Sequence, residues 1–126
     1  MPIQYCINRD ESLIEETWSG KVSAADLRSY WQVYLADPEV MRLRKTLVDL
    51  RGAKIEFLGH ELDALIASVV LPALGELEWK TAIVVNNPVH YGVSRQYQVF
   101  AERYSQDAIF HDLDIARAWL NGAAAT

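Results

Sequence analysis

The chain has 126 residues, the size of one ordinary domain, and 12 Lys and Arg against 17 Asp and Glu give a formal net charge of −5 at pH 7. This balance argues against duplex nucleic acid or an anionic membrane as the main partner, because both bind surfaces rich in Lys and Arg. With 51% hydrophobic and 23% charged residues, the composition indicates a folded globular protein rather than a disordered one.

The sequence gives no sign of a membrane segment or an oxidising compartment. The longest apolar run, 64–74, contains Ser68 and Pro72 and is too short to cross a bilayer. The N-terminus lacks the basic and apolar regions of a signal peptide, and the single cysteine, Cys6, permits no internal disulfide. We therefore expect a cytoplasmic protein in which Cys6 is a buried strand residue.

The N-terminal part predicts a β-hairpin followed by a helix. Apolar alternation predicts strands at 3–8 and 12–19, joined by a turn at 9–11 and ended by Gly20. Ser23 has the character of a helix N-cap, with an acidic residue three positions later. One face of this helix is formed by Leu27, Tyr30, Trp31, Tyr34 and Leu35.

In the middle of the chain, strands alternate with helices. Asp37–Pro38 ends the first helix, and 45–50 is typical of a strand covered on both faces. Apolar residues at helical spacing predict a second helix that begins at about Gly59 and ends at Pro72. The clearest strand of the chain is 79–85.

The last third predicts a helix, a short strand and a terminal helix. After a turn at 86–88, one helix face carries Val89, Val93, Tyr97, Phe100 and Tyr104. A short strand follows at 107–111, and Asp112 caps the terminal helix. From Gly122 onward the chain should fray.

The predicted order is ββαβαβαβα, which indicates an α/β fold. Strands that alternate with helices form right-handed parallel crossovers, and the opening hairpin adds an antiparallel edge. We therefore expect a single mixed β-sheet with flanking helices, one domain at 1–122 and a frayed tail at 123–126.

Four stretches resemble the STAS superfamily, in particular its SpoIIAA-like branch of small bacterial proteins. They are 18–23, 46–51, 82–97 and 109–120. The resemblance implies a four- or five-stranded mixed sheet and a regulatory or ligand-binding role rather than catalysis. Phosphoswitch members carry Ser or Thr in the loop after the third strand, but 51–60 has no hydroxyl residue. A phosphorylation switch at this loop is therefore not expected.

Polar residues gather where the third and fourth predicted strands end. In parallel sheets, ligands collect beyond the carboxyl ends of the strands, beside helix N-termini. If the strands are neighbours, Arg51 and Arg95 flank one concavity suited to a carboxylate or a phosphate. Alternatively, Arg95 pairs with Asp49 or Glu61 and the loops only bound the sheet. The residues of this predicted ligand- or partner-binding surface are Asp49, Arg51, His60, Glu61, Asn86, Asn87, His90, Tyr91, Ser94 and Arg95.

No arrangement typical of catalysis, metal binding or cofactor binding is apparent in the sequence. His90 and Ser94 are four residues apart and read as an exposed polar pair, with a minor catalytic role as the alternative. The three histidines, His60, His90 and His111, are scattered, and no glycine-rich phosphate loop is present. We therefore expect no enzyme activity, metal or cofactor.

The two aromatic helix faces leave three interpretations open. In the first, both faces pack in the core of the domain. In the second, one face contacts a second copy of the chain in a homodimer. In the third, the helices move apart to admit a lipid-like ligand. The sequence thus favours a non-enzymatic, STAS-like regulatory or protein-interaction module without the usual phosphoacceptor. The alternative is a carrier of a small apolar or anionic molecule between sheet and helices, which needs a cavity of roughly 300 Å³ or more.

Overall fold

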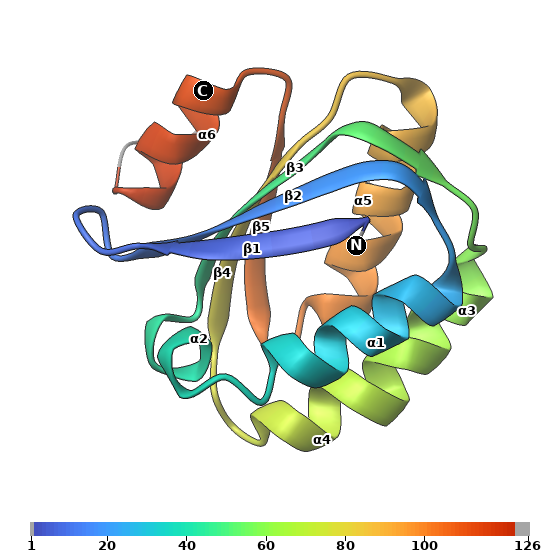
Figure 1. Ribbon diagram of the computed structural model, residues 1–126, viewed down its shortest axis with the longest axis horizontal. Helices are drawn as coiled ribbons and strands as arrows, with labels where there is room; N and C mark the ends of the chain where they lie inside the picture. Colours follow the sequence, from blue (N-terminus) through green and yellow to red (C-terminus); the bar gives the residue numbers. More distant parts are fainter. Residues whose placement is uncertain (1, 123–126) are drawn as a thin grey trace.

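A computed structural model describes residues 2–122, and the predicted frayed tail at 123–126 lies outside the described residues. One five-stranded sheet has the order β1-β2-β3-β4-β5, with β1 antiparallel to β2 and the other pairs parallel (Figure 1). The strands are β1 (Ile3–Asn8), β2 (Leu13–Val22), β3 (Lys45–Ile55), β4 (Trp79–Val84) and β5 (Ser105–Phe110). The expected α/β fold with a single mixed sheet is therefore confirmed.

The helices lie between and after the strands. They are α1 (Ala24–Tyr34), α2 (Pro38–Leu43), α3 (Gly59–Leu65), α4 (Leu71–Leu74), α5 (Pro88–Ala101) and α6 (Leu113–Leu120), with a π-helical segment η1 (Ile66–Val70) between α3 and α4. None of the described helices is long and apolar enough to cross a membrane.

The helices cover the two faces of the sheet unequally. Figure 1 shows α1, α3, α4 and α5 on one side and α6 on the other. Successive strand residues point to opposite faces, so Leu47 packs in the small cluster under α6 and Val48 in the large cluster under the other helices. This explains why β3 and β4 read as continuous apolar runs.

The start of α1 is fixed by local sequence, as predicted. Ser23 accepts a hydrogen bond from the Asp26 backbone N–H, and the Asp26 carboxylate accepts one from the Ser23 N–H. The buried face of the helix carries Leu27, Tyr30, Trp31 and Tyr34. These rings are buried inside the chain, which favours core packing over contact with a second copy.

Of the two prolines predicted to end helices, Pro38 acts as predicted and Pro72 does not. Pro38 does follow the end of α1, but Asp37 caps a further short helix, α2, in which proline occupies the first turn. Pro72 does not close the second long helix, which continues to Leu74. The i→i+5 spacing of η1 widens the helix just before Pro72, so the missing proline N–H falls in the first turn of α4.

Strands β2 and β3 are longer than predicted. Gly20 does not end β2: it lies inside the strand with φ of +67°, and pairing with β3 continues to Val22 opposite Ile55. The register shifts between Thr17 and Ser19, which marks a bulge. These additional residues mix lysine and arginine with glycine and small or branched apolar residues, so they show no continuous apolar run in the sequence.

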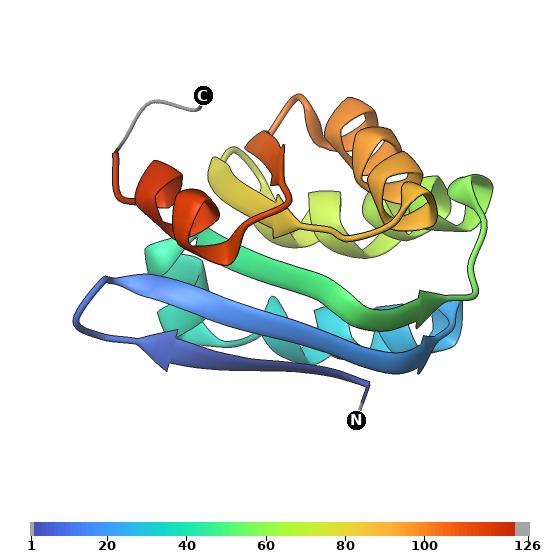
Figure 2. The ribbon, with the colours of Figure 1, turned by 90° about the horizontal axis from the view of Figure 1, so that it is seen from above.

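Cys6 is exposed rather than buried, so the prediction for it was wrong. Figure 2 shows β1 at one edge of the sheet and β5 at the other. Helix α6 packs on β3, β4 and β5, and it leaves the corresponding face of β1 open. The side chain of Cys6 lies on that open face, opposite the face of Ile3, Tyr5 and Ile7.

Candidate functional site

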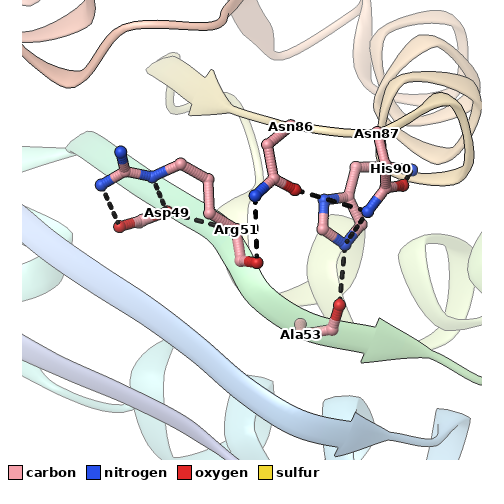
Figure 3. A network of polar contacts seen from close by, with 6 residues as sticks. All are labelled: Asp49, Arg51, Ala53, Asn86, Asn87 and His90. Carbon is pink, nitrogen blue, oxygen red and sulfur yellow. Dashed lines mark hydrogen bonds and ion pairs between the residues drawn. The ribbon is translucent and has the colours of Figure 1, made fainter.

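Several of the predicted surface residues form a polar network at the end of β4, beside the middle of β3, which continues to Ile55 (Figure 3). The strands are neighbours, as the prediction required. Asn86 Nδ2 donates to the carbonyl oxygen of Arg51 at 3.4 Å, and Asn87 Nδ2 donates to Asn86 Oδ1 at 3.4 Å. Asp49, Arg51, Asn87 and His90 are therefore brought into one neighbourhood by the structure.

Asp49 pairs with Arg51 rather than with Arg95. Arg51 Nε donates to Asp49 Oδ1 and Arg51 Nη2 to Asp49 Oδ2, both at 3.0 Å. Partial burial raises the pKa of Asp49, but the hydrogen bonds from Arg51 outweigh it, so the net pKa lies below its ordinary value. Arg95 instead donates to Gln98 Oε1 at 2.9 Å. The two arginines thus do not share one carboxylate.

His90 and Ser94 are buried, which corrects the prediction of an exposed pair. The His90 residue is only 1% exposed, and its Nε2 lies 2.8 Å from the carbonyl oxygen of Ala53. Because that oxygen can only accept, Nε2 carries the proton and Nδ1 is left buried without a partner among the described residues. Ser94 Oγ donates to the His90 backbone oxygen at 2.7 Å, so no serine–histidine dyad forms.

Asn87 and His90 fasten the start of α5 to the extended end of β3. Asn87 Oδ1 accepts from the His90 backbone N–H at 2.9 Å and caps the helix. Asn87 Nδ2 lies 3.3 Å from His90 Nε2, but both atoms carry hydrogen, so this contact is not a hydrogen bond. These two side chains therefore hold the loop in place rather than present free groups to a ligand.

The remaining predicted residues stay on the surface. His60, Tyr91 and Arg95 are exposed, and within residues 2–122 no hydrogen bond or ion pair joins His60 or Tyr91 to the network. In the same part of the chain, no group of three His, Cys, Asp or Glu side chains is placed to hold a metal ion.

A second candidate site lies inside the molecule, between the sheet and the layer of α1, α3, α4 and α5. An apolar cavity here encloses about 80 Å³, and the whole hollow, including the space open to solvent, measures about 700 Å³. Its aromatic walls are Trp18, Trp31, Tyr34, Phe57, Trp79, Tyr97 and Tyr104. Few polar residues reach it, and they are Glu16, Thr46, Thr81 and Ser94.

Glu16 is a buried carboxyl group at this cavity. Trp18 Nε1 donates to Glu16 Oε2 at 2.7 Å, and the Tyr30 hydroxyl donates to Oε1 at 2.6 Å. Burial raises the pKa of Glu16, and the two hydrogen bonds only partly oppose this effect. The group therefore keeps its proton to higher pH than an ordinary glutamate does.

Thr46 joins two of the aromatic walls. Trp79 Nε1 donates to Thr46 Oγ1 at 2.9 Å, and the hydroxyls of Thr46 and Tyr34 share a hydrogen bond of 2.6 Å. Tyr34 and Trp79 also pack ring against ring, with centroids 5.9 Å apart. Thr46 thus gives a hydrogen-bond partner to both Trp79 Nε1 and the Tyr34 hydroxyl, and the two rings are held in fixed positions.

A second buried acid lies beside the cavity, on β5. Burial raises the pKa of Asp107 to about 6, although hydrogen bonds from Ser105 and Thr81 oppose the shift. Its Oδ2 atom is buried without a partner among the described residues. The nearby wall contains Tyr104, whose hydroxyl donates to that of Tyr97 at 3.2 Å.

A ligand site between the sheet and the helices was predicted only as the carrier alternative, and Glu16 was not among the predicted site residues, although one signal for it was present. Ile14, Glu16 and Trp18 occupy alternate positions of β2 and so share one face of the strand. An acidic residue between two large apolar residues on a covered face marks a buried carboxyl group, which always needs hydrogen-bond partners. The cavity itself depends on how distant side chains pack.

Comparison with known proteins identifies the fold. No protein-family model matches the sequence, and no curated protein matches it. A crystal structure of an uncharacterized protein from the DUF3478 family, described as having a SpoIIAA-like fold and coming from Shewanella loihica PV-4, matches with a TM-score of 0.66. The match covers 94% of this chain and 93% of that chain at 18% sequence identity. The chain therefore has a SpoIIAA-like fold, as the resemblance implied.

Proposed function

We propose that this chain is a non-enzymatic binding module that holds a small, largely apolar molecule in the cavity between the sheet and its four-helix layer. The observation that carries the proposal is an apolar hollow into which only a few polar side chains, such as Glu16 and Thr46, project. Ligand sites typically combine mostly apolar walls with a small number of placed polar groups and perturbed pKa values. The proposal develops the carrier alternative of the sequence analysis.

The size of the cavity limits the ligand. The enclosed 80 Å³ is well below the roughly 300 Å³ expected of a carrier of drug-sized molecules. An apolar cavity of about 150 Å³ binds benzene, so a single ring of that size is the largest compact ligand that we expect this cavity to hold. A longer molecule would have to reach out of the cavity into solvent. The proposed ligand is therefore small and compact.

A pair of variants on one helix tests this function. Val93 lines the cavity and Val99 is 61% exposed, and both belong to α5. Val93→Phe fills the hollow, whereas Val99→Phe adds the same ring to the surface. With benzene as the probe, we expect the melting temperature of the wild type and of Val99→Phe to rise, because ligand binding stabilises the folded state.

The Val93→Phe variant should show no rise with benzene, although circular dichroism should show it to be folded. The absence of a rise in the wild type would contradict the proposal. An equal rise in all three proteins would do the same, because it would place the binding outside the cavity.

A second candidate is the regulatory or protein-interaction module that the STAS resemblance implies, working through the loops after β3 and β4. The observation that favours it is the exposure of Leu58, Val89 and Tyr91 around these loops, near exposed Arg51 and Arg95. Large apolar residues beside arginines are typical of the centre of a protein interface. This surface would bind a protein partner with acidic groups.

Arg95→Ala tests the second candidate, with Arg28→Ala on the exposed face of α1 as its matched control. Each form is expressed in the native host and cross-linked, and its partners are identified by mass spectrometry. We expect one partner to be recovered with the wild type and Arg28→Ala and to be lost with Arg95→Ala. Equal recovery with all three proteins would rule the surface out.

A further inference from the structure

The cavity has one ionisable acid and no base. Glu16 is the only carboxyl group in its lining, and no Lys, Arg or His lines it within the part of the chain that the structure describes. The titratable groups that face Glu16 are tyrosines: Tyr30 and Tyr34 of α1 and Tyr97 of α5. No cation in the structure therefore balances the charge of an ionised Glu16.

The carboxyl group retains free hydrogen-bonding capacity. A carboxylate has about four lone-pair positions, and the donors Trp18 and Tyr30 occupy one on each oxygen. Because both donors belong to the walls of the core, they hold the carboxyl group in a fixed orientation at the cavity. A positively charged hydrogen-bond donor that enters the cavity can approach the free positions.

Aromatic rings surround the same space. Tyr34 stacks on Tyr30 with centroids 5.1 Å apart and packs against Trp79 at 5.9 Å, while Trp18 packs against Phe57 at 6.2 Å. The faces of Trp and Tyr rings attract cations within about 6 Å of the centroid, and this attraction grows when water is excluded. An aromatic cage around one acid is suited to an organic ammonium ion.

We propose that the cavity binds a small alkylammonium ion, with the carboxylate of Glu16 as its counter-ion and the aromatic rings as its walls. This inference rests on the proposed binding function and specifies the ligand class. A carboxylate or phosphate ligand is disfavoured, because it would meet an acid and no base. A neutral ligand can fill the cavity, but it leaves the carboxyl group without its best partner.

Proton balance gives the proposal a second signature. Burial raises the pKa of Glu16, so at any pH below that raised pKa the empty site holds a proton that the ammonium ion displaces. The exchange is balanced: the protonated acid and the cation give the ion pair and one proton released to solvent. Alkylammonium affinity should therefore rise with pH, by up to about tenfold per pH unit while Glu16 is protonated in the empty site.

The test compares three small probes of similar shape: isobutylammonium, isobutanol and isobutyrate. Dissociation constants are measured by NMR titration between pH 5 and 8. We expect isobutylammonium to bind at least about tenfold more tightly than isobutanol at the upper end of this range, and isobutyrate to bind least. The affinity for isobutanol should not change with pH.

Glu16→Gln identifies the group responsible. It removes the charge at nearly constant shape, so the affinity for isobutylammonium should fall to that for isobutanol. Glu15→Gln is the matched control, because Glu15 is adjacent but on the opposite face of β2, where it pairs with Arg117. The substituted amide can keep its oxygen on Trp18 Nε1, which only donates, while its NH2 group donates to the Tyr30 hydroxyl. If that variant does not fold, the ratio of the wild-type affinities for isobutylammonium and isobutanol tests the ammonium site on its own.

The outcomes separate this inference from the proposed function. Equal affinities of the wild type for the ammonium ion and the alcohol at every pH would overturn the ammonium site and leave the binding module standing. Tighter binding of isobutyrate would also overturn it. Failure of every probe, including benzene, to bind would overturn both.

Discussion

The loop network and the interior cavity contain similar polar groups but use them differently. At the loop after β4, Asp49, Arg51 and Asn87 are hydrogen-bonded within the network, which ties this loop to the middle of β3. At the cavity, Glu16 and Thr46 are hydrogen-bonded to aromatic walls and still border open space. Polar residues at strand ends therefore do not by themselves indicate a ligand site, whereas polar atoms at an apolar cavity do.

The largest expected effect is the loss of the Thr46 hydroxyl at the cavity. Thr46→Val keeps the side-chain shape but leaves Trp79 Nε1 and the Tyr34 hydroxyl buried without this partner. We expect the free energy of unfolding to fall by about 4 kcal/mol, since each unsatisfied buried group costs about 1–3 kcal/mol. Urea denaturation measures this change. The matched control is Thr17→Val on the exposed side of β2, for which a comparable loss would contradict the explanation.

The buried acid at β5 should make stability fall as pH rises. The pKa of Asp107 is about 6 in the folded protein and near 3.8 in the unfolded chain, so the folded state holds more protons between these values. We expect a loss of about 3 kcal/mol between about pH 4 and pH 6, measured by denaturation at a series of pH values. Asp107→Asn should remove most of this slope, and an unchanged slope would place the titrating group elsewhere. A part of the pH dependence should remain in this variant, because the pKa of Glu16 is raised in the folded protein too.

At the loop after β4, buried His90 should contribute more to the free energy of unfolding than its exposed neighbour Tyr91. His90→Leu keeps the bulk but removes the hydrogen bond to the Ala53 oxygen, which ties α5 to β3. We expect a loss of about 2 kcal/mol in the free energy of unfolding, while Tyr91→Leu on the surface changes it by less than about 0.5 kcal/mol. Equal effects would show that the network does not fasten the loop.

The smallest expected effect concerns the ion pair of the loop network. Asp49→Asn should cost about 0.5 kcal/mol, because the pair is partly solvated. Since the pKa of Asp49 is lowered in the folded protein, this contribution is present above the ordinary carboxyl pKa and is lost as the pH falls below it. The difference between wild type and variant should shrink in high salt. A difference that salt does not change would point to an effect on the backbone instead.

Local sequence signals were enough to predict the order of strands and helices, except for the short helix α2. The capping box of Ser23 and Asp26 and the cap at Asp112 depend on residues three positions apart. The apolar run of β4 depends on burial on both faces. Such signals lie within a few residues of one another, so a single sequence displays them.

Other features depend on contacts between distant residues and were not predictable. The end of β3, residues 51–55, has no apolar run and is a strand because it pairs with residues about 33 positions earlier, such as Ile55 with Val22. His90 was expected to be exposed, but β3 extends far enough for Ala53 to cover it. The cavity arises from the packing of side chains on three strands and four helices, and no spacing in the sequence encodes its volume.

The most direct test of the central claim is to locate bound isobutylammonium by intermolecular nuclear Overhauser effects in solution. The methyl groups of Ile83 and Leu62 line the cavity, whereas those of Val89 lie on the surface near the loop network. The account expects effects from the ligand methyl groups to Ile83 and Leu62 and none to Val89. Effects to Val89 without any to Ile83 or Leu62 would contradict it and return the search for a ligand to the loops.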